Sequence, residues 1–152
     1  AQYERLQHFI RRGLAQGATR VAGGEGRPDG LGKGWFVRPT VFAGVRNDMD
    51  IAREEIFGPV LSVIGYDGED EAVEIANDSP YGLQAYVFSS QQQRALDVAS
   101  RLRVGSVLVN RVTPELSAPF GGVKQSGIGR EFGLFGMEAF LEPKTVALAQ
   151  PG

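Results

Sequence analysis

Cysteine is absent from the 152-residue sequence, and histidine occurs once, as His8. Without a thiol, the chain by itself forms no disulfide bond, zinc–thiolate site or iron–sulfur centre, and it provides no thiol nucleophile. His8 has no serine and acid grouped around it, so neither a Ser–His–Asp arrangement nor a histidine-based metal site is predicted. From its own residues the chain is therefore expected to provide no catalytic nucleophile and no metal site.

Neither sign of charge dominates, because 16 lysines and arginines stand against 18 aspartates and glutamates, for a formal net charge of −2. The basic residues are scattered rather than gathered in runs, which argues against a nucleic-acid-binding surface. No apolar segment approaches the ~20 residues that a membrane span needs, and the amino terminus has the pattern of a polar helix rather than a signal peptide. We expect a cytoplasmic protein with neither nucleic-acid nor membrane partners.

The composition, 42% hydrophobic and 22% charged residues, is that of a globular domain whose core needs no disulfide support. Apolar spacing of three and four residues predicts helices, and β-branched runs predict strands. The predicted helices are 2–14, 69–77, one that begins near residue 90, and 130–141, and the main predicted strands are 60–66, 83–88, 104–109 and 144–149. Because two strand–helix–strand units follow one another, we expect parallel pairing in an α/β domain.

A glycine-rich stretch covers residues 23–34 and includes the pair Gly32–Lys33, which invites comparison with a phosphate-binding loop. That motif requires glycine five positions before Gly32 and Ser or Thr after the lysine, whereas this sequence has Arg27 and Gly34 there. The stretch is therefore predicted to be a surface loop. A second loop, 111–126, follows a predicted parallel strand, at the end of the sheet where such folds bind ligands.

The most unusual local chemistry lies in residues 53–60, where two adjacent carboxylates, Glu54 and Glu55, precede Phe57 and a Gly-Pro pair. Neighbouring side chains point to different sides, so one glutamate can face a cleft while the other stays in solvent. The residues alone leave two interpretations open, a binding site and an ordinary charged surface.

Four segments together resemble the NAD(P)-dependent aldehyde dehydrogenase superfamily. Glu-Glu-Ile-Phe-Gly-Pro-Val at 54–60 is similar to the signature of that family, and the segment 34–42 is similar to the strand before it. The turn 77–83 and the loop 119–131, which contains Phe-Gly-Gly, resemble two later family motifs. All four occur in family order, and the resemblance spans essentially the whole chain.

The resemblance implies the carboxyl-terminal part of an aldehyde dehydrogenase catalytic domain over residues 1–152. It implies a three-layer, open, mostly parallel sheet with flanking helices, ending in an edge strand at 144–149 that serves dimer or tetramer formation. In the family, a cysteine attacks the aldehyde, a hydride passes to NAD or NADP, and an activated water releases the acid. That cysteine and the nucleotide-binding domain lie before the first residue of this chain, so the chain alone is expected to be inactive.

The resemblance also assigns roles to individual residues. Glu55 resembles the glutamate that accepts hydrogen bonds from the nicotinamide ribose, and Phe57 resembles the aromatic residue beside the nicotinamide ring. Gln2 and Arg5 resemble the glutamine and the basic residue near the cofactor ribose, although lysine is common at the second position, and a solvent-facing pair is the alternative. Phe120 resembles an aromatic residue that lines the aldehyde tunnel.

Several questions stay open at the level of sequence. The variable loop 111–118 is too mixed to choose among small aliphatic, aromatic and semialdehyde substrates, and Arg111 and Glu115 either meet a charged substrate or pair with each other. Arg130 and Glu142 resemble members of a structural ion-pair network. Two alternatives to the dehydrogenase fragment are a stand-alone binding or oligomerisation module and a semialdehyde enzyme within a larger bifunctional polypeptide.

Overall fold

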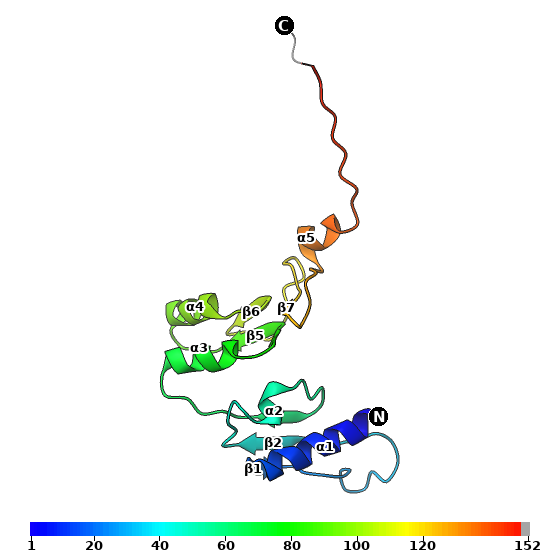
Figure 1. Cartoon of the computed structure of the whole chain (residues 1–152), viewed down its shortest axis with the longest axis vertical. Helices are drawn as coiled ribbons and strands as arrows, with labels where there is room; N and C mark the ends of the chain where they lie inside the picture. Colours follow the sequence, from blue (N-terminus) through cyan, green and yellow to red (C-terminus); the bar gives the residue numbers. More distant parts are fainter. Residues whose placement is uncertain (150–152) are drawn as a thin grey trace. The chain divides into compact units, whose positions relative to one another are not determined.

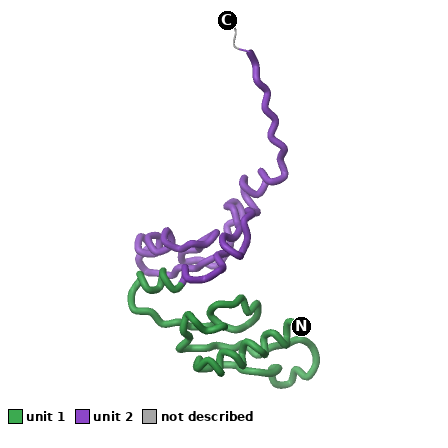
Figure 2. Tube along the Cα trace, viewed as in Figure 1, with its two compact units in different colours: residues 1–75 green, residues 76–152 purple. Residues whose placement is uncertain are grey.

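The computed structural model describes residues 1–149 of the chain (Figure 1). The chain divides into two compact units, residues 1–75 and the remainder from residue 76 onward (Figure 2). Each unit has its own secondary structure and is described by itself.

The first unit is a short sheet with a helix packed on one face. Helix α1 (Gln2–Ala15) precedes strands β1 (Thr19–Ala22), β2 (Thr40–Ala43) and β3 (Val60–Ser62). The strand order is β1-β2-β3, with β1 antiparallel and β3 parallel to β2. Strand β2 alternates in burial, because its buried side chains face the helix.

The core of this unit forms between α1, β2 and the short helix α2 (Asp50–Arg53). Ile10 of α1 and Phe42 of β2 are fully buried, and Met49 and Ile51 close the core from the α2 side. The predicted helix 2–14 is therefore confirmed, and its apolar stripe is the reason that it packs on the sheet.

The second unit centres on a strand–helix–strand motif. Strand β5 (Gln84–Val87), helix α4 (Gln92–Arg101) and strand β6 (Ser106–Val109) follow one another, and the two strands pair in parallel. Helix α3 (Glu69–Asn77) leads into this unit, and β4 (Tyr81–Gly82) pairs antiparallel with β7 (Val123–Lys124). A last helix, α5, covers Gly133–Glu138. The predicted α/β class is thus confirmed, with parallel pairs in both units.

Some predicted details are wrong. Strand β3 ends at Ser62 rather than at residue 66. Ser90 followed by Gln93 is a sequence pattern that predicts a capping box at the start of α4. The structure has no side-chain cap there: Gln91 is the N-cap residue, and its amide donates to the Ser89 hydroxyl. Gln93 instead donates to Asp97 along the helix surface.

The carboxyl-terminal predictions also need correction. Helix α5 is shorter than the predicted 130–141, because Phe120 and Glu131 exchange two backbone hydrogen bonds of 2.8 and 2.7 Å that keep Glu131 out of the helix. The strand predicted at 144–149 is not formed, since no described segment pairs with these exposed residues. Among residues 1–149, no helix has both the length and the hydrophobicity for a membrane crossing.

Candidate cofactor site

The first turn of α1 is hydrogen-bonded to the segment 55–57. The Gln2 side-chain amide donates to the carbonyl oxygens of Phe57, at 2.7 Å, and Ile56, at 3.3 Å. The Arg5 guanidinium donates to the carbonyl oxygen of Glu55 at 2.7 Å. Four residues that the sequence predicted for the cofactor site therefore come together in the first unit.

The local sequence explains why the segment turns at this point. Ile56 is buried against the core, whereas the next residue, Phe57, has a left-handed backbone with φ of 57°. A Cβ atom on Gly58 would lie 2.3 Å from the Leu6 methyl carbon Cδ2, so any other residue here would require the buried Leu6 side chain to shift. The carbonyl of Pro59 then accepts a hydrogen bond from Thr40 and starts the pairing of β2 with β3.

The side chains of Glu55 and Phe57 are exposed on this segment. The Phe57 ring is 82% exposed, and no hydrogen bond or ion pair to the Glu55 carboxylate is found among residues 1–149. An ionised carboxylate has about four acceptor positions. The Glu55 side chain can therefore accept two hydroxyl hydrogens at once, which fits a ribose diol beside an aromatic ring.

Arg5 is held from two sides. Its guanidinium carbon lies 5.2 Å from the centre of the Phe9 ring, in a cation–π contact, while one nitrogen binds the Glu55 carbonyl. Gln2 and Arg5 were predicted to bind the cofactor ribose. In the structure both side chains donate hydrogen bonds to the main chain of residues 55–57.

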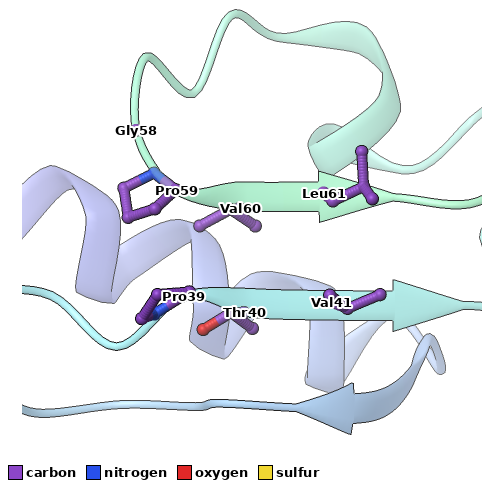
Figure 3. A pocket seen from close by; sticks show the side chains of 7 residues that line it. All are labelled: Pro39, Thr40, Val41, Gly58, Pro59, Val60 and Leu61. Atoms are coloured by element: carbon purple, nitrogen blue, oxygen red, sulfur yellow. The ribbon is translucent and has the colours of Figure 1, made fainter. Parts of the chain in front are cut away.

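A shallow apolar groove lies where β2 and β3 begin (Figure 3). It has a volume of about 360 Å³ and is lined by residues 39–41 and 58–61. No ionisable side chain lines the groove, so this feature offers packing surface rather than reactive groups.

In the second unit, Phe120 lines a small cavity of about 150 Å³. Its ring centre lies 6.3 Å from that of Phe132, and the cavity also touches Gln84 of β5 and Ser106 of β6. Phe120 is thus half-buried at a cavity wall.

The loop beside this cavity carries a charged pair. Hydrogen bonds from the Ser117 hydroxyl and amide lower the pKa of Glu115, and Arg111 lowers it further. The Arg111–Glu115 pair is 3.6 Å apart and exposed. Of the two interpretations that the sequence left open, pairing with each other is the one found in the structure.

Close backbone contacts require glycine at position 121 of the Phe-Gly-Gly motif and at position 105, which lies against it. A Cβ atom on Gly121 would lie 2.2 Å from the Gly129 carbonyl oxygen, and one on Gly105 would lie 1.5 Å from the Gly121 carbonyl oxygen. Arg130 completes the loop by donating to the carbonyls of Gly122 and Gly129 at 2.7 and 2.8 Å. Its described partners are therefore main-chain carbonyls rather than the carboxylate of Glu142.

Sequence reasoning missed the role of Asn77. Its side chain donates to the Arg101 carbonyl and accepts from the Arg103 amide, at 2.9 and 2.7 Å. The Lys124 ammonium group donates to the carbonyls of Asn77 and Ser79 at 2.8 and 2.9 Å. An asparagine in a turn-forming stretch signals a turn, but nothing local indicates that it joins the end of α4 to β7.

Residues 1–146 match the family described as the aldehyde dehydrogenase family. The chain belongs to the aldehyde dehydrogenase family. It is 55% identical over 145 residues to a 3-succinoylsemialdehyde-pyridine dehydrogenase of a Pseudomonas species, covering 95% of this chain and 30% of that protein. The family resemblance seen in the sequence is thereby confirmed.

Two solved structures are similar to this aldehyde dehydrogenase chain. An aldehyde dehydrogenase mutant of Pseudomonas syringae, in complex with NAD+ and octanal, has 52% identity and a TM-score of 0.90 over 93% of this chain and 29% of its own. An aldehyde dehydrogenase of Mycobacterium tuberculosis, in complex with NAD+, has 47% identity and a TM-score of 0.94 over 97% of this chain and 30% of its own. The α/β fold of the family is confirmed, and the chain spans about 30% of the length of the curated relatives that it matches.

Proposed function

We propose that the chain is the carboxyl-terminal part of the catalytic domain of an enzyme that oxidises an aldehyde to a carboxylic acid with NAD+ or NADP+. The observation that carries this proposal is the segment 55–57, where a carboxylate without a described partner and an exposed aromatic ring are presented together. The NAD+ complexes of similar family members support the choice of cofactor.

In this proposal each residue of the segment has a separate task. The Glu55 carboxylate accepts hydrogen bonds from the two hydroxyls of the nicotinamide ribose, and the Phe57 ring packs beside the nicotinamide. When bound, the dinucleotide supplies the hydride acceptor. The chain's own contribution is to fix the position of the cofactor relative to the substrate.

The nucleophile in this proposal is a cysteine thiolate, which the 152 residues do not contain. The thiolate adds to the aldehyde carbonyl, the resulting thiohemiacetal carbon loses a hydride and becomes a thioester, and water cleaves the thioester to the acid. The 152 residues by themselves are therefore expected to oxidise no aldehyde.

Phe120 is proposed to line the path of the aldehyde, together with the loop 111–118. The support is its place on the wall of the 150 Å³ cavity. Self-association to a dimer or tetramer belongs to the same proposal, because 144–149 offers backbone groups that a second chain can pair.

The first test is the intact mass of the natural gene product compared with the 16.4 kDa of this chain. A heavier product that reduces NAD+ or NADP+ only when an aldehyde is present would support the proposal. A product of the chain's own mass without this activity would contradict it and favour a non-catalytic module of the same fold.

A further inference from the structure

Asn110 extends the pairing of β5 and β6 beyond the ends of both strands. The ladder ends with the pair Val87 and Val109, and the Asn110 amide then donates to the Val87 carbonyl at 2.9 Å. The Asn110 side chain continues the pairing, because its Oδ1 accepts from the Ser89 amide and its Nδ2 donates to the Ser89 carbonyl, both at 2.9 Å. One side-chain amide thus bonds both the donor and the acceptor of the Ser89 main chain.

The backbone changes direction at the same residue. Asn110 has a φ of 52°, in the left-handed region that asparagine enters more readily than most residues with a side chain. Strand β6 ends just before it, and the chain continues as the loop 111–118. Ser89 is itself fixed, since its hydroxyl accepts from the Gln91 amide, at 3.1 Å, in front of α4. The start of the loop is therefore attached to the strand–helix–strand motif.

The loop 111–118 is bonded within itself. The Arg111 guanidinium lies 3.6 Å from the Glu115 carboxylate, and the Ser117 hydroxyl donates to that carboxylate at 2.7 Å. The Ala118 amide donates to the Glu115 carbonyl at 3.1 Å. These bonds limit rearrangement inside the loop, so the place of the loop depends on how its two ends are held.

The other end of the loop is held beside the cavity of the second unit. Phe120 exchanges two backbone hydrogen bonds with Glu131 just after the loop ends. Pro114, Glu115 and Ala118 line the same cavity of about 150 Å³ as Phe120. A displacement at the start of the loop therefore changes the shape of this cavity.

We infer that Asn110 is a positioning residue for aldehyde selectivity, which holds the loop 111–118 against the Phe120 cavity through its two side-chain bonds to Ser89. Asn110 is exposed and is not among the residues that line the cavity, so it acts through the loop. This inference rests on the proposed function, in which the cavity lies on the path of the aldehyde.

The test uses Asn110→Gly and Asn110→Asp in the full-length enzyme, with Ser90→Ala as the control. Glycine adopts the left-handed backbone freely but makes neither side-chain bond. Aspartate keeps the shape of the side chain and the bond from the Ser89 amide, but it cannot donate to the Ser89 carbonyl. Ser90 is exposed beside Ser89 and takes part in neither bond.

The first readout is the opening of the loop, measured without cofactor or substrate. Chymotrypsin cleaves after large hydrophobic residues in opened segments, so the rate of cleavage after exposed Leu116 reports how often the loop opens. We expect this rate to rise about fivefold in Asn110→Asp and about tenfold or more in Asn110→Gly, as the loss of one and two hydrogen bonds predicts. Cleavage after exposed Tyr66 in the first unit is the internal reference and should not change.

The second readout is selectivity between a slender aldehyde, butanal, and a bulky one, phenylacetaldehyde. A cavity wall that moves excludes bulk less well, so relative kcat/KM should shift toward phenylacetaldehyde by about fivefold to tenfold in both variants. The kcat for butanal and the dissociation constant of NAD+ should change less than about threefold, because the cavity side chains and the segment 55–57 are unaltered. With Phe120→Ala already present, Asn110→Gly should shift selectivity by less than about twofold, since both changes act on the same wall.

An equal loss of kcat/KM for both aldehydes would overturn the inference, because it would give Asn110 a structural role alone. Wild-type selectivity in Asn110→Gly would also overturn it, since the left-handed backbone would then be sufficient without the side-chain bonds. So would unchanged cleavage after Leu116. A wild-type enzyme that oxidises no aldehyde with either dinucleotide would instead overturn the proposed function. The two failures are distinguishable, because the cleavage rates show whether Asn110 holds the loop without reference to any reaction.

Discussion

The side-chain amide of Gln2 lies 2.7 Å from the main-chain carbonyl oxygen of Phe57, across 55 positions of sequence. This contact joins helix α1, which its apolar stripe predicts, to the segment 55–57, which the sequence marks only by its residue types. It also attaches the exposed turn that carries Glu55 and Phe57 to a helix with a buried face.

Replacement of Glu55 by glutamine should slow hydride transfer more than it weakens cofactor binding. The amide keeps the size of the side chain but exchanges one acceptor oxygen for a donor, so one ribose hydroxyl loses its partner. We expect single-turnover hydride transfer to fall about tenfold, while the dissociation constant of NAD+ rises less. The measurement is stopped-flow formation of reduced nicotinamide in the full-length enzyme.

Glu54→Gln is the matched control for this experiment. Glu54 is the neighbouring exposed carboxylate and faces a different side of the chain. Its replacement should leave both constants unchanged. If Glu55→Gln behaves like this control, Glu55 has no part in placing the cofactor.

The sequence predicted those parts of the fold that depend on neighbours along the chain. Helix α1 and the motif β5–α4–β6 follow from apolar periodicity, and the segment 54–60 was singled out by its residues. The strands β1, β4 and β7 were missed, because elements of two to four residues exist only through pairing with distant partners. The hydrogen bond from Gln2 to Phe57 has no local signal for the same reason.

The carboxyl-terminal errors have one physical origin. Apolar residues at helical spacing predict a helix over 130–141. The backbone hydrogen bonds between Phe120 and Glu131 keep Glu131 out of that helix, and α5 begins only at Gly133. The apolar residues beyond Phe132 remain exposed in the described chain, and 144–149 has no strand to pair with. Apolar periodicity predicts that one face of a segment is buried, but it does not predict which other segment packs against that face.

Phe120→Ala should change the preference among aldehydes. The ring forms part of a cavity of about 150 Å³ and packs near Phe132, so its removal widens the cavity on one side. Relative kcat/KM should shift toward bulkier aldehydes by about tenfold, the effect of a few methylene-sized contacts. The comparison uses a series of linear, branched and aromatic aldehydes at saturating cofactor.

The exposed Phe88, which lies outside that cavity, provides the control variant Phe88→Ala, whose selectivity should match the wild type. A Phe120→Ala enzyme with altered cofactor affinity and unaltered aldehyde selectivity would place Phe120 outside the substrate path.

Gly105→Ala should destabilise the second unit strongly. The added Cβ would lie 1.5 Å from the carbonyl oxygen of Gly121, which belongs to a backbone that cannot move without disturbing the Phe-Gly-Gly loop. Overpacking of this kind costs about 1–3 kcal/mol or more. Gly32→Ala is the control, since nothing lies within 4 Å of its added Cβ. Urea unfolding followed by circular dichroism should show a lower midpoint for Gly105→Ala alone, and equal midpoints would mean that the close approach is not maintained in solution.

The attachment of α1 to α2 should weaken in acid. Hydrogen bonds from Arg12 and Gln16 lower the pKa of Asp50 below its ordinary value of 3.8. Because the pKa of Asp50 is depressed in the folded state, its stabilising effect is present above pH 3.8 and is lost as the pH falls through the folded value. Asp50→Asn should therefore be less stable than the wild type at neutral pH, and the difference should vanish at low pH.

Thermal unfolding of the chain at a series of pH values measures this difference. Arg12→Gln should reproduce the effect, because it removes the main cause of the lowered pKa of Asp50 while leaving the Gln16 bonds in place. The stability difference between wild type and Asp50→Asn could instead persist unchanged below the folded pKa of Asp50. Protonation would then have removed the charge of Asp50 without changing the stability, and the aspartate would act through its shape and hydrogen bonds.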